Sequence, residues 1–208
     1  MTGSVLDKRA HFEAIAQEWD GMQAPERQQD LNALLSSYAH LFDSTSRILE
    51  IGTGTGSLIP SIRALTPIAS VLSIDFAHAM LQHARIKFPH ANLIQADAAY
   101  LPFSNSPTRD SSFDLIICHN AFPHFNDPLA TLQSMAIRLL PGSPLLILHD
   151  QSRQTVNALH QKIGGAIAQD LLPEPQALSA IMVQAGLGQV EVEDGVHHFH
   201  AIGQRAIH

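Results

Sequence analysis

A short apolar segment that runs directly into three alternating glycines is the feature that most constrains how this chain can fold. Residues 48–56 read Ile-Leu-Glu-Ile-Gly-Thr-Gly-Thr-Gly, and helical spacing follows over residues 57–65. Glycine adopts positive φ angles readily and, lacking a Cβ, lets a ligand approach the backbone. In an open parallel sheet, ligands bind in the crevice beyond the carboxyl ends of the strands. The segment therefore predicts a strand, a tight turn at a ligand site, and a helix.

Two common phosphate-binding patterns do not fit this turn. The dinucleotide fingerprint G-x-G-x-x-G would need a third glycine where Ser57 stands. A P-loop needs G-x-x-x-x-G-K-[ST], and the sequence contains no such run. Neither pattern accounts for the glycine turn.

Short apolar segments alternate with helical patterns along the middle of the chain. The predicted strands are residues 47–51, 70–74, 92–95, 113–118 and 145–148. The predicted helices are residues 57–65, 77–87, 129–139 and 153–169. Nearly continuous apolar strands that alternate with helices are typical of a parallel sheet covered on both faces.

The two ends of the chain depart from this alternation. Helical spacing recurs over residues 7–20, 26–41 and 175–185. Residues 189–193 and 196–202 predict two strands joined by a tight turn at Asp194–Gly195. We therefore expect an α/β, Rossmann-like fold: a seven-stranded, mostly parallel sheet with an antiparallel C-terminal strand and helices on both faces. Residues 1–208 form a single domain in this prediction, with a helical N-terminal lid over 1–45 and the core over 46–208.

Composition narrows the class of partner. Hydrophobic residues make up 45% of the 208 residues and charged residues 15%, which is enough apolar material for a sizeable core. The formal net charge is −7 and no lysine or arginine cluster is present, so we expect no nucleic-acid partner. Cys118 is the single cysteine, no apolar run approaches the roughly 20 residues that span a membrane, and no secretory leader opens the sequence. We expect a cytoplasmic protein that acts on a small molecule without membrane contact, and composition leaves its oligomeric state open.

Several motifs along the chain occur in the order found in a known enzyme family. An acidic residue precedes the glycines at Glu50, Asp75 closes the second predicted strand, and Asp97 follows the third. Phe-Asp-Leu-Ile begins the fourth strand at residues 113–116, and Leu-Pro-Gly precedes the fifth at residues 140–142. With these motifs the sequence resembles the class I S-adenosylmethionine-dependent methyltransferases over roughly residues 10–203.

The resemblance implies a role for each motif. It places Asp75 on the ribose hydroxyls of S-adenosylmethionine and Asp97 on the adenine amine, and both groups need hydrogen-bond acceptors that a carboxylate supplies. Phe76 and Ala98 could flank the adenine. The expected cofactor-binding residues are Trp19, Glu50, Gly52, Thr53, Gly54, Gly56, Asp75, Phe76, Asp97, Ala98, His119 and Asn120.

A narrower resemblance covers the first part of the chain. Residues 120–124, Asn-Ala-Phe-Pro-His, and residues 11–20, which contain Trp19, are similar to segments of the ubiquinone/menaquinone-biosynthesis methyltransferases. The second segment resembles the helix which that group folds over its cofactor. The resemblance weakens after residue 149, so it does not imply a quinone substrate.

Histidines follow the fourth and fifth predicted strands, where the acceptor pocket of this fold lies. His119 and His124 follow one strand and His149 the other, and His160 shares a helix face with Arg153 and Asn157. Acid/base catalysis by His119, His124 or His149 is one interpretation. A transition-metal site built from His119, His124, His149 and His160 is a second, because imidazole suits such metals. In a third, these histidines only hydrogen-bond loops and line a polar pocket.

We therefore predict transfer of a methyl group from S-adenosylmethionine to a small-molecule acceptor. Two alternatives stay open at this point. One is a metal-dependent methyltransferase that acts on a metal-bound or metalloid acceptor through the histidines. The other is a non-catalytic protein that only binds S-adenosylmethionine.

Overall fold

The computed structural model describes residues 4–24, 26–103 and 112–207. Its strands are β1 Arg47–Ile51, β2 Ser70–Asp75, β3 Asn92–Gln95, β4 Leu115–His119, β5 Pro144–His149, β6 Leu187–Asp194 and β7 Phe199–Arg205. Its α-helices are α1 Val5–Ile15, α2 Arg27–Ser36, α3 Ile59–Leu65, α4 His78–Lys87, α5 Pro128–Ala136, α6 Arg153–Ile163 and α7 Pro175–Gln184. Short 3₁₀ helices are η1 Asp20–Met22, η2 Ala39–Leu41, η3 Ala98–Tyr100, η5 Phe122–His124 and η6 Gly165–Ile167. Within the described ranges, no helix is both long and apolar enough to cross a membrane.

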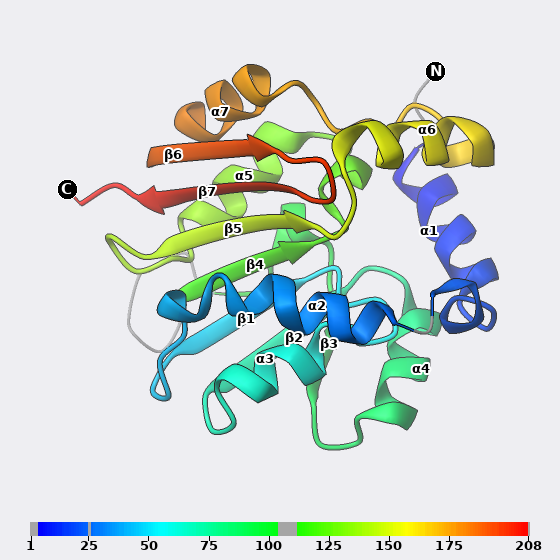
Figure 1. Cartoon of the computed structure of the whole chain (residues 1–208), viewed down its shortest axis with the longest axis horizontal. Coiled ribbons are helices and arrows are strands. Elements are labelled where there is room, and N and C mark those ends of the chain that lie inside the picture. The colour runs from blue at the N-terminus through cyan, green and yellow to red at the C-terminus, as the bar shows by residue number, and fades with distance from the viewer. Residues whose placement is uncertain (1–3, 25, 104–111, 208) are drawn as a thin grey trace.

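The described strands form one seven-stranded sheet in the order β3-β2-β1-β4-β5-β7-β6 (Figure 1). Neighbours from β3 to β5 are parallel, and β7 is antiparallel to both β5 and β6. This arrangement confirms the predicted fold class. The strand order reverses between β1 and β4, and a crevice opens at such a reversal because the following helices leave toward opposite faces.

Successive strand residues enter two separate apolar layers, because side chains of a strand alternate between the faces of the sheet. Leu49 and Ile116 join a layer with α5 and α7, whereas Ile48 and Ile117 join a layer with α2 and α3. All four side chains are buried. Both faces of the central strands are therefore covered, which explains why β1 and β4 have no polar face in the sequence.

Several predicted element ends are wrong by a few residues. Helix α1 ends at Ile15 instead of residue 20, and turns lead from there into η1. Helix α6 ends at Ile163 instead of residue 169, because Gly164 follows with a φ of +75° that a right-handed helix does not accommodate. The predicted tight turn at Asp194–Gly195 is a longer connection, since β7 begins only at Phe199.

Helices α1 and α6 lie together beyond the carboxyl ends of the parallel strands, at the right of Figure 1. Helix α2 crosses the front of the sheet in the same view. The three helices therefore bring residues from the start and the later part of the chain to the edge of the sheet where the crevice opens.

We expect the buried layers to dominate stability. Ile117→Ala in β4, where the side chain is fully buried, should lower the free energy of unfolding by about 2–5 kcal/mol through lost burial and a residual cavity. Ile68→Ala makes the same change at a side chain that is 79% exposed, and should cost no more than about 0.5 kcal/mol. Urea unfolding of both variants measures the difference, and equal costs would contradict this account of the core.

Candidate functional site

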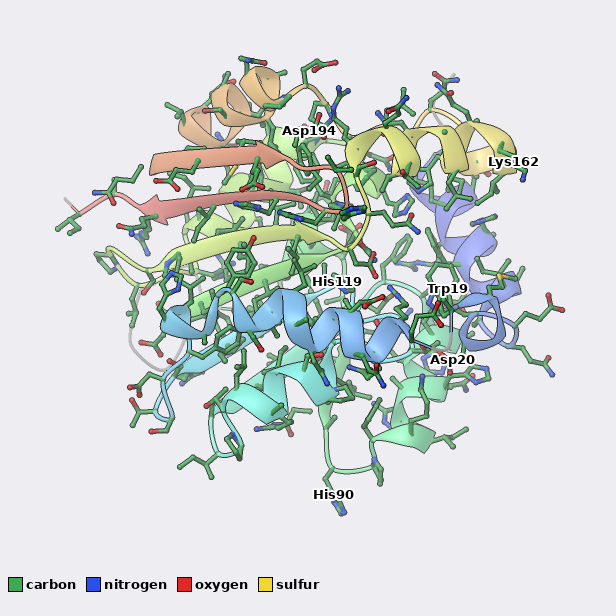
Figure 2. The ribbon with its side chains drawn as sticks, in the orientation of Figure 1. Trp19, Asp20, His90, His119, Lys162 and Asp194 are labelled. Carbon is green, nitrogen blue, oxygen red and sulfur yellow. The ribbon has the colours of Figure 1, made fainter. Side chains whose placement is uncertain are left out.

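A pocket of about 190 Å³ lies beyond the carboxyl ends of β1, β2 and β4. Most of the residues predicted from the sequence meet in its walls, and Trp19 and His119 can be located in Figure 2. The predicted residues that line it are Trp19, Gly52, Thr53, Gly54, Asp75, Phe76, Asp97, Ala98, His119, Asn120 and His124. Four other predicted residues, Glu50, Gly56, His149 and His160, lie outside its walls.

Each glycine of the turn has a different neighbour. A Cβ on Gly52 would lie 2.4 Å from the Cβ of Ala121, and a Cβ on Gly56 would lie 2.8 Å from the Phe88 ring. A Cβ on Gly54 would meet nothing closer than Trp19 Nε1 at 4.0 Å. All three have positive φ angles, of +73°, +90° and +56° in the order named. Gly52 and Gly56 thus permit close packing, while Gly54 leaves its bare backbone open to the pocket.

Two carboxyl groups lie at different depths beneath this turn. Asp75 lines the pocket, where its Oδ2 accepts a hydrogen bond from Gly54 N at 2.8 Å and its Oδ1 accepts one from Ala77 N at 2.9 Å. Burial raises the pKa of Asp75 to about 6, against the lowering effect of these bonds. Glu50 is fully buried behind the turn and accepts a hydrogen bond from Ser73 Oγ at 2.5 Å. Burial raises the pKa of Glu50 to about 7.

Asp97 begins the next wall of the pocket. Its Oδ1 accepts a hydrogen bond from Ala99 N at 2.9 Å, so the side chain caps η3. Phe76 and Ala98 line the same pocket and contribute apolar surface. A carboxylate therefore lies beside a flat apolar wall, on the side of the pocket formed after β2 and β3.

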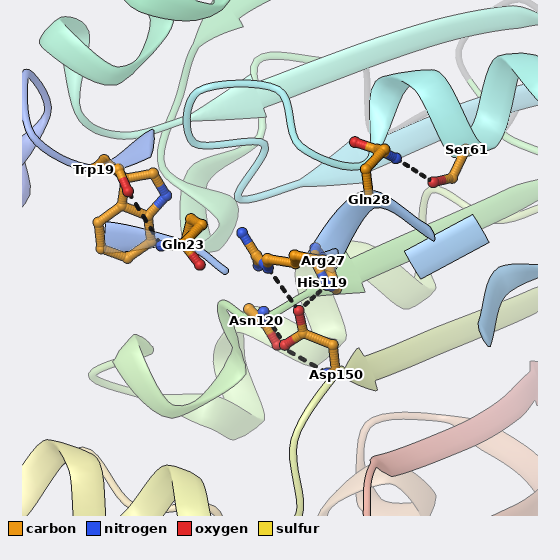
Figure 3. Close-up of polar contacts among 8 residues, drawn as sticks. All are labelled: Trp19, Gln23, Arg27, Gln28, Ser61, His119, Asn120 and Asp150. Atoms are coloured by element: carbon orange, nitrogen blue, oxygen red, sulfur yellow. Dashed lines mark hydrogen bonds and ion pairs between the residues drawn. The ribbon is translucent and has the colours of Figure 1, made fainter. Parts of the chain in front are cut away.

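A polar cluster closes the opposite side, where β4 and β5 end (Figure 3). Asp150 accepts hydrogen bonds from Arg27 Nε at 2.8 Å and from Asn120 Nδ2 at 2.6 Å. His119 Nε2 lies 4.0 Å from Asp150 Oδ2 and, among the described residues, has no hydrogen-bond partner. Burial lowers the pKa of His119 to about 4, so the ring is neutral at pH 7 and keeps a lone pair. Asn120 has a φ of +50°, which turns the chain sharply after β4.

A second polar cluster forms the roof of the pocket. Lys8 Nζ lies 2.7 Å from Asp170 Oδ1, and His124 Nδ1 lies 2.9 Å from Asp170 Oδ2. His160 Nδ1 is hydrogen-bonded to the backbone oxygen of Asp170. The Phe12 ring packs edge-on against His124 with centroids 4.8 Å apart. Helix α1 is therefore tied to the segment after η6 through a buried ion pair, since both charged side chains are at most 3% exposed.

The register between β4 and β5 turns His149 away from the pocket. His119 lies opposite Leu148 in the β4–β5 pair, so His149 is one residue further along and faces the other side of the sheet. Its ring packs against Phe199 at a centroid distance of 6.3 Å. Burial lowers the pKa of His149 to about 3.

In the part of the chain that the structure describes, the four histidines considered as metal ligands lie near one another, with the rings of His124 and His160 4.9 Å apart, but their ligand atoms do not converge on one point. His124 and His160 each use Nδ1 to bond Asp170, and His149 faces away. Among the described residues, the group whose ligand atoms lie within 4.8 Å of one another is a different one, Glu193, His198 and His200. The predicted transition-metal site at the pocket therefore has no support in this geometry.

Several residues of the site were not predicted from the sequence. The pocket walls include Lys8, Phe12 and Arg27, and the acids that hold the two cations in place are Asp170 and Asp150. The sequence did contain a pattern that pairs two of these residues: Lys8 and Phe12 are four residues apart and so share one face of α1. Asp150 follows the end of β5 much as Asp75 closes β2.

Known proteins match this chain over its central segment and beyond. The profile of a family described as a methyltransferase domain matches residues 48–142. The malonyl-[acyl-carrier protein] O-methyltransferase of Methylococcus capsulatus is 35% identical over 114 residues, which are 53% of this chain and 39% of that protein. The ubiquinone biosynthesis O-methyltransferase of Xanthomonas axonopodis pv. citri is 30% identical over 209 residues, covering 93% of this chain and 83% of that protein. The chain thus spans well under half of the first relative and most of the second.

Solved structures agree on the fold. A methyltransferase from Thermotoga maritima, described as dependent on S-adenosylmethionine, has a TM-score of 0.72 at 17% identity, covering 93% of this chain and 97% of that one. At this identity the likeness concerns the fold. The sequence matches carry the assignment, because the Xanthomonas relative is similar over most of both chains. The chain belongs to the S-adenosylmethionine-dependent methyltransferases.

Proposed function

We propose that the pocket binds S-adenosylmethionine and holds a small-molecule acceptor against its methyl group. The observation that carries this proposal is the contact between Gly54 and Asp75. The Gly54 backbone is open to the pocket, and Asp75 lies directly beside it at 2.8 Å. A bare backbone surface next to a carboxylate suits a ligand that combines an amino-acid end with a ribose diol.

The walls divide among the parts of this ligand. Asp75 accepts the ribose hydroxyls, Asp97 accepts the adenine amine, and Phe76 with Ala98 lies against the adenine faces. The methionine end lies along residues 52–54, near Trp19. Glu50 and Gly56 act behind the wall, because one is hydrogen-bonded to Ser73 and the other packs on Phe88.

The acceptor lies between the two polar clusters. S-adenosylmethionine supplies an electrophilic methyl group, and the acceptor atom must lose any proton that it carries. His119 can take that proton because its ring is neutral and its buried Nε2 has no hydrogen-bond partner among the described residues, and Asp150 stabilises the resulting charge from 4.0 Å. His124 borders the same space and is fixed by Asp170. His149 lies outside the pocket walls and its ring packs against Phe199, so we assign it no role in proton transfer.

Residues 1–45 act as the lid of a single domain in this proposal. Lys8 and Phe12 reach from α1 to Asp170 and His124, which closes the pocket above the acceptor. Removal of water from the reacting atoms is the expected benefit. The geometry of the pocket histidines does not support a metal-dependent mechanism there.

Asp75→Asn tests the cofactor site. Loss of the charged acceptor should weaken binding of S-adenosylmethionine by about 1.5–3 kcal/mol, the range for hydrogen bonds to a charged group. Calorimetric titration of the purified chain measures the affinity, with Asp30→Asn on the exposed side of α2 as the matched control. An unchanged affinity in folded Asp75→Asn would remove the ribose assignment, and no binding by the unaltered chain would overturn the proposed function.

The affinity for S-adenosylmethionine should also depend on pH. Asp75 has a pKa of about 6, and only its ionised form accepts hydrogen bonds from both ribose hydroxyls. Affinity should therefore be full above pH 7 and fall about 10-fold by pH 5, one unit below the pKa. Glu50 titrates near pH 7 but lies behind the wall, so Asp75→Asn should remove most of the dependence. A dependence that persists in Asp75→Asn would assign it to another group.

His119→Gln tests the transfer itself. Formation of S-adenosylhomocysteine is measured with a panel of hydroxyl and carboxyl compounds, since the two relatives are O-methyltransferases by name. The variant should lower kcat by roughly 100-fold, as expected for loss of a general base, and still bind S-adenosylmethionine. His90→Gln, at an exposed turn remote from the pocket, is the control. Full activity in His119→Gln would exclude the base, and binding without turnover of any acceptor would favour a non-catalytic protein.

A further inference from the structure

The end of the β6–β7 hairpin brings an acid and two histidines onto one side of the sheet. Glu193 and His200 are direct register partners in this antiparallel pair. Opposite residues of such a pair have Cβ atoms about 4.5–5.5 Å apart. His198 precedes His200 by two residues, and their rings are stacked with centroids 5.6 Å apart and planes at 11°. The backbone pairing therefore holds Glu193 opposite His200, and His198, just before β7, stacks on His200.

The donor atoms of these side chains converge. His198 Nε2 lies 3.2 Å from Glu193 Oε1, and His200 Nδ1 lies 4.0 Å from Glu193 Oε2. One donor atom from each residue lies within 4.8 Å of the other two. Zinc binds histidine nitrogen and carboxylate oxygen at about 2.0–2.2 Å in a tetrahedron, which separates neighbouring donors by roughly 3.3 Å. Small side-chain rotations would bring all three donors to that spacing.

His200 contributes a ring nitrogen that is free to bind a ligand. Its Nδ1 is buried and has no hydrogen-bond partner among the described residues. The ring is held by Tyr38, which packs edge-on at a centroid distance of 5.4 Å. A buried polar nitrogen without a partner costs stability, and this one faces the carboxylate of Glu193.

A simple ion pair explains only part of this arrangement. A protonated His198 would satisfy Glu193 at 3.2 Å, but His200 Nδ1 would still lack a partner. Protonation of both rings would place two like charges in a parallel stack. Coordination of one cation uses all three groups at once, with both imidazoles neutral.

We propose that Glu193, His198 and His200 bind a divalent transition metal of the zinc type. Two imidazoles and one carboxylate match the ligand preference of zinc, and this donor set leaves a fourth position. That position opens to solvent, because Glu193 is 59% exposed and His198 30% exposed. The site is separate from the pocket histidines and does not rest on the proposed methyl transfer.

The metal would cross-link the end of β6 to the start of β7, next to the strand that leads to Asp150. His200 pairs with Leu148 in β5, two residues before Asp150. Asp194 at the end of β6 is already bonded to Arg153 of α6 at 2.7 Å. The site thus lies where β5, β6, β7 and the start of α6 meet, and we assign it a role in stability.

A zinc titration of the full chain, after removal of metal by dialysis against a chelator, tests this proposal. We expect calorimetry to show one site of micromolar or tighter affinity. The double variant His198→Gln/His200→Gln should bind zinc at least about 10-fold more weakly, because two of three ligands are lost. His90→Gln, at the opposite edge of the molecule from Asp194 in Figure 2, should bind zinc as the unaltered chain does. Unchanged zinc affinity in the double variant, or no zinc binding by the unaltered chain, would overturn the site.

Thermal unfolding gives a second test of the zinc site that does not depend on whether the double variant folds. Zinc at a free concentration of about 100 times its Kd should raise the Tm of the unaltered chain by about 5–11 °C. Glu193→Gln changes an exposed side chain, so it should fold normally and show a much smaller rise. An equal rise in Glu193→Gln would show that the zinc binds elsewhere and would contradict the proposal.

Discussion

The close contact between the turns after β1 and β4 is the constraint on which the rest of the structure depends. Gly52 lies so near Ala121 that no side chain fits between them. Gly52 N and Thr53 N also donate hydrogen bonds to Ile74 O, which fixes the turn to the end of β2. Three neighbouring strands therefore end at one place with fixed spacing. The helices that follow β1 and β4 diverge from there, and the space between them is the pocket.

Local motifs made much of this predictable. The glycine turn, Asp75 and Asp97 each follow directly from a strand that the apolar pattern indicates, so their place at the carboxyl edge of the sheet followed from topology alone. Strands β1 and β3 have the predicted bounds, and the other parallel strands differ by one or two residues. The differences at α1 and α6 arise where turn residues or a glycine end a helix whose apolar spacing continues.

Contacts between distant segments were not predictable in the same way. Arg27 and Asp150 are 123 residues apart in sequence, and nothing near either residue identifies the other as its partner. Lys8 could not be predicted as a buried residue for the same reason, because its partner Asp170 lies far away in the sequence. His149 shows a different limit: strand position was predicted correctly, but the face of a residue at a strand end depends on register. One residue separated it from the position opposite His119.

The ion pair between Lys8 and Asp170 joins the first helix to a segment that is synthesised only after all five parallel strands. A chain synthesised only as far as β5 already contains the glycine turn and the pocket-lining Lys8 and His124, yet it lacks Asp170, which holds both side chains in place. Lys8 would then lack its charged partner, and α1 would be held by Glu13, which accepts hydrogen bonds from His78 N and Ala79 N, but not by Asp170. We therefore expect ligand binding and the docking of the segment around Asp170 to stabilise each other, because Asp170 holds two side chains that line the pocket.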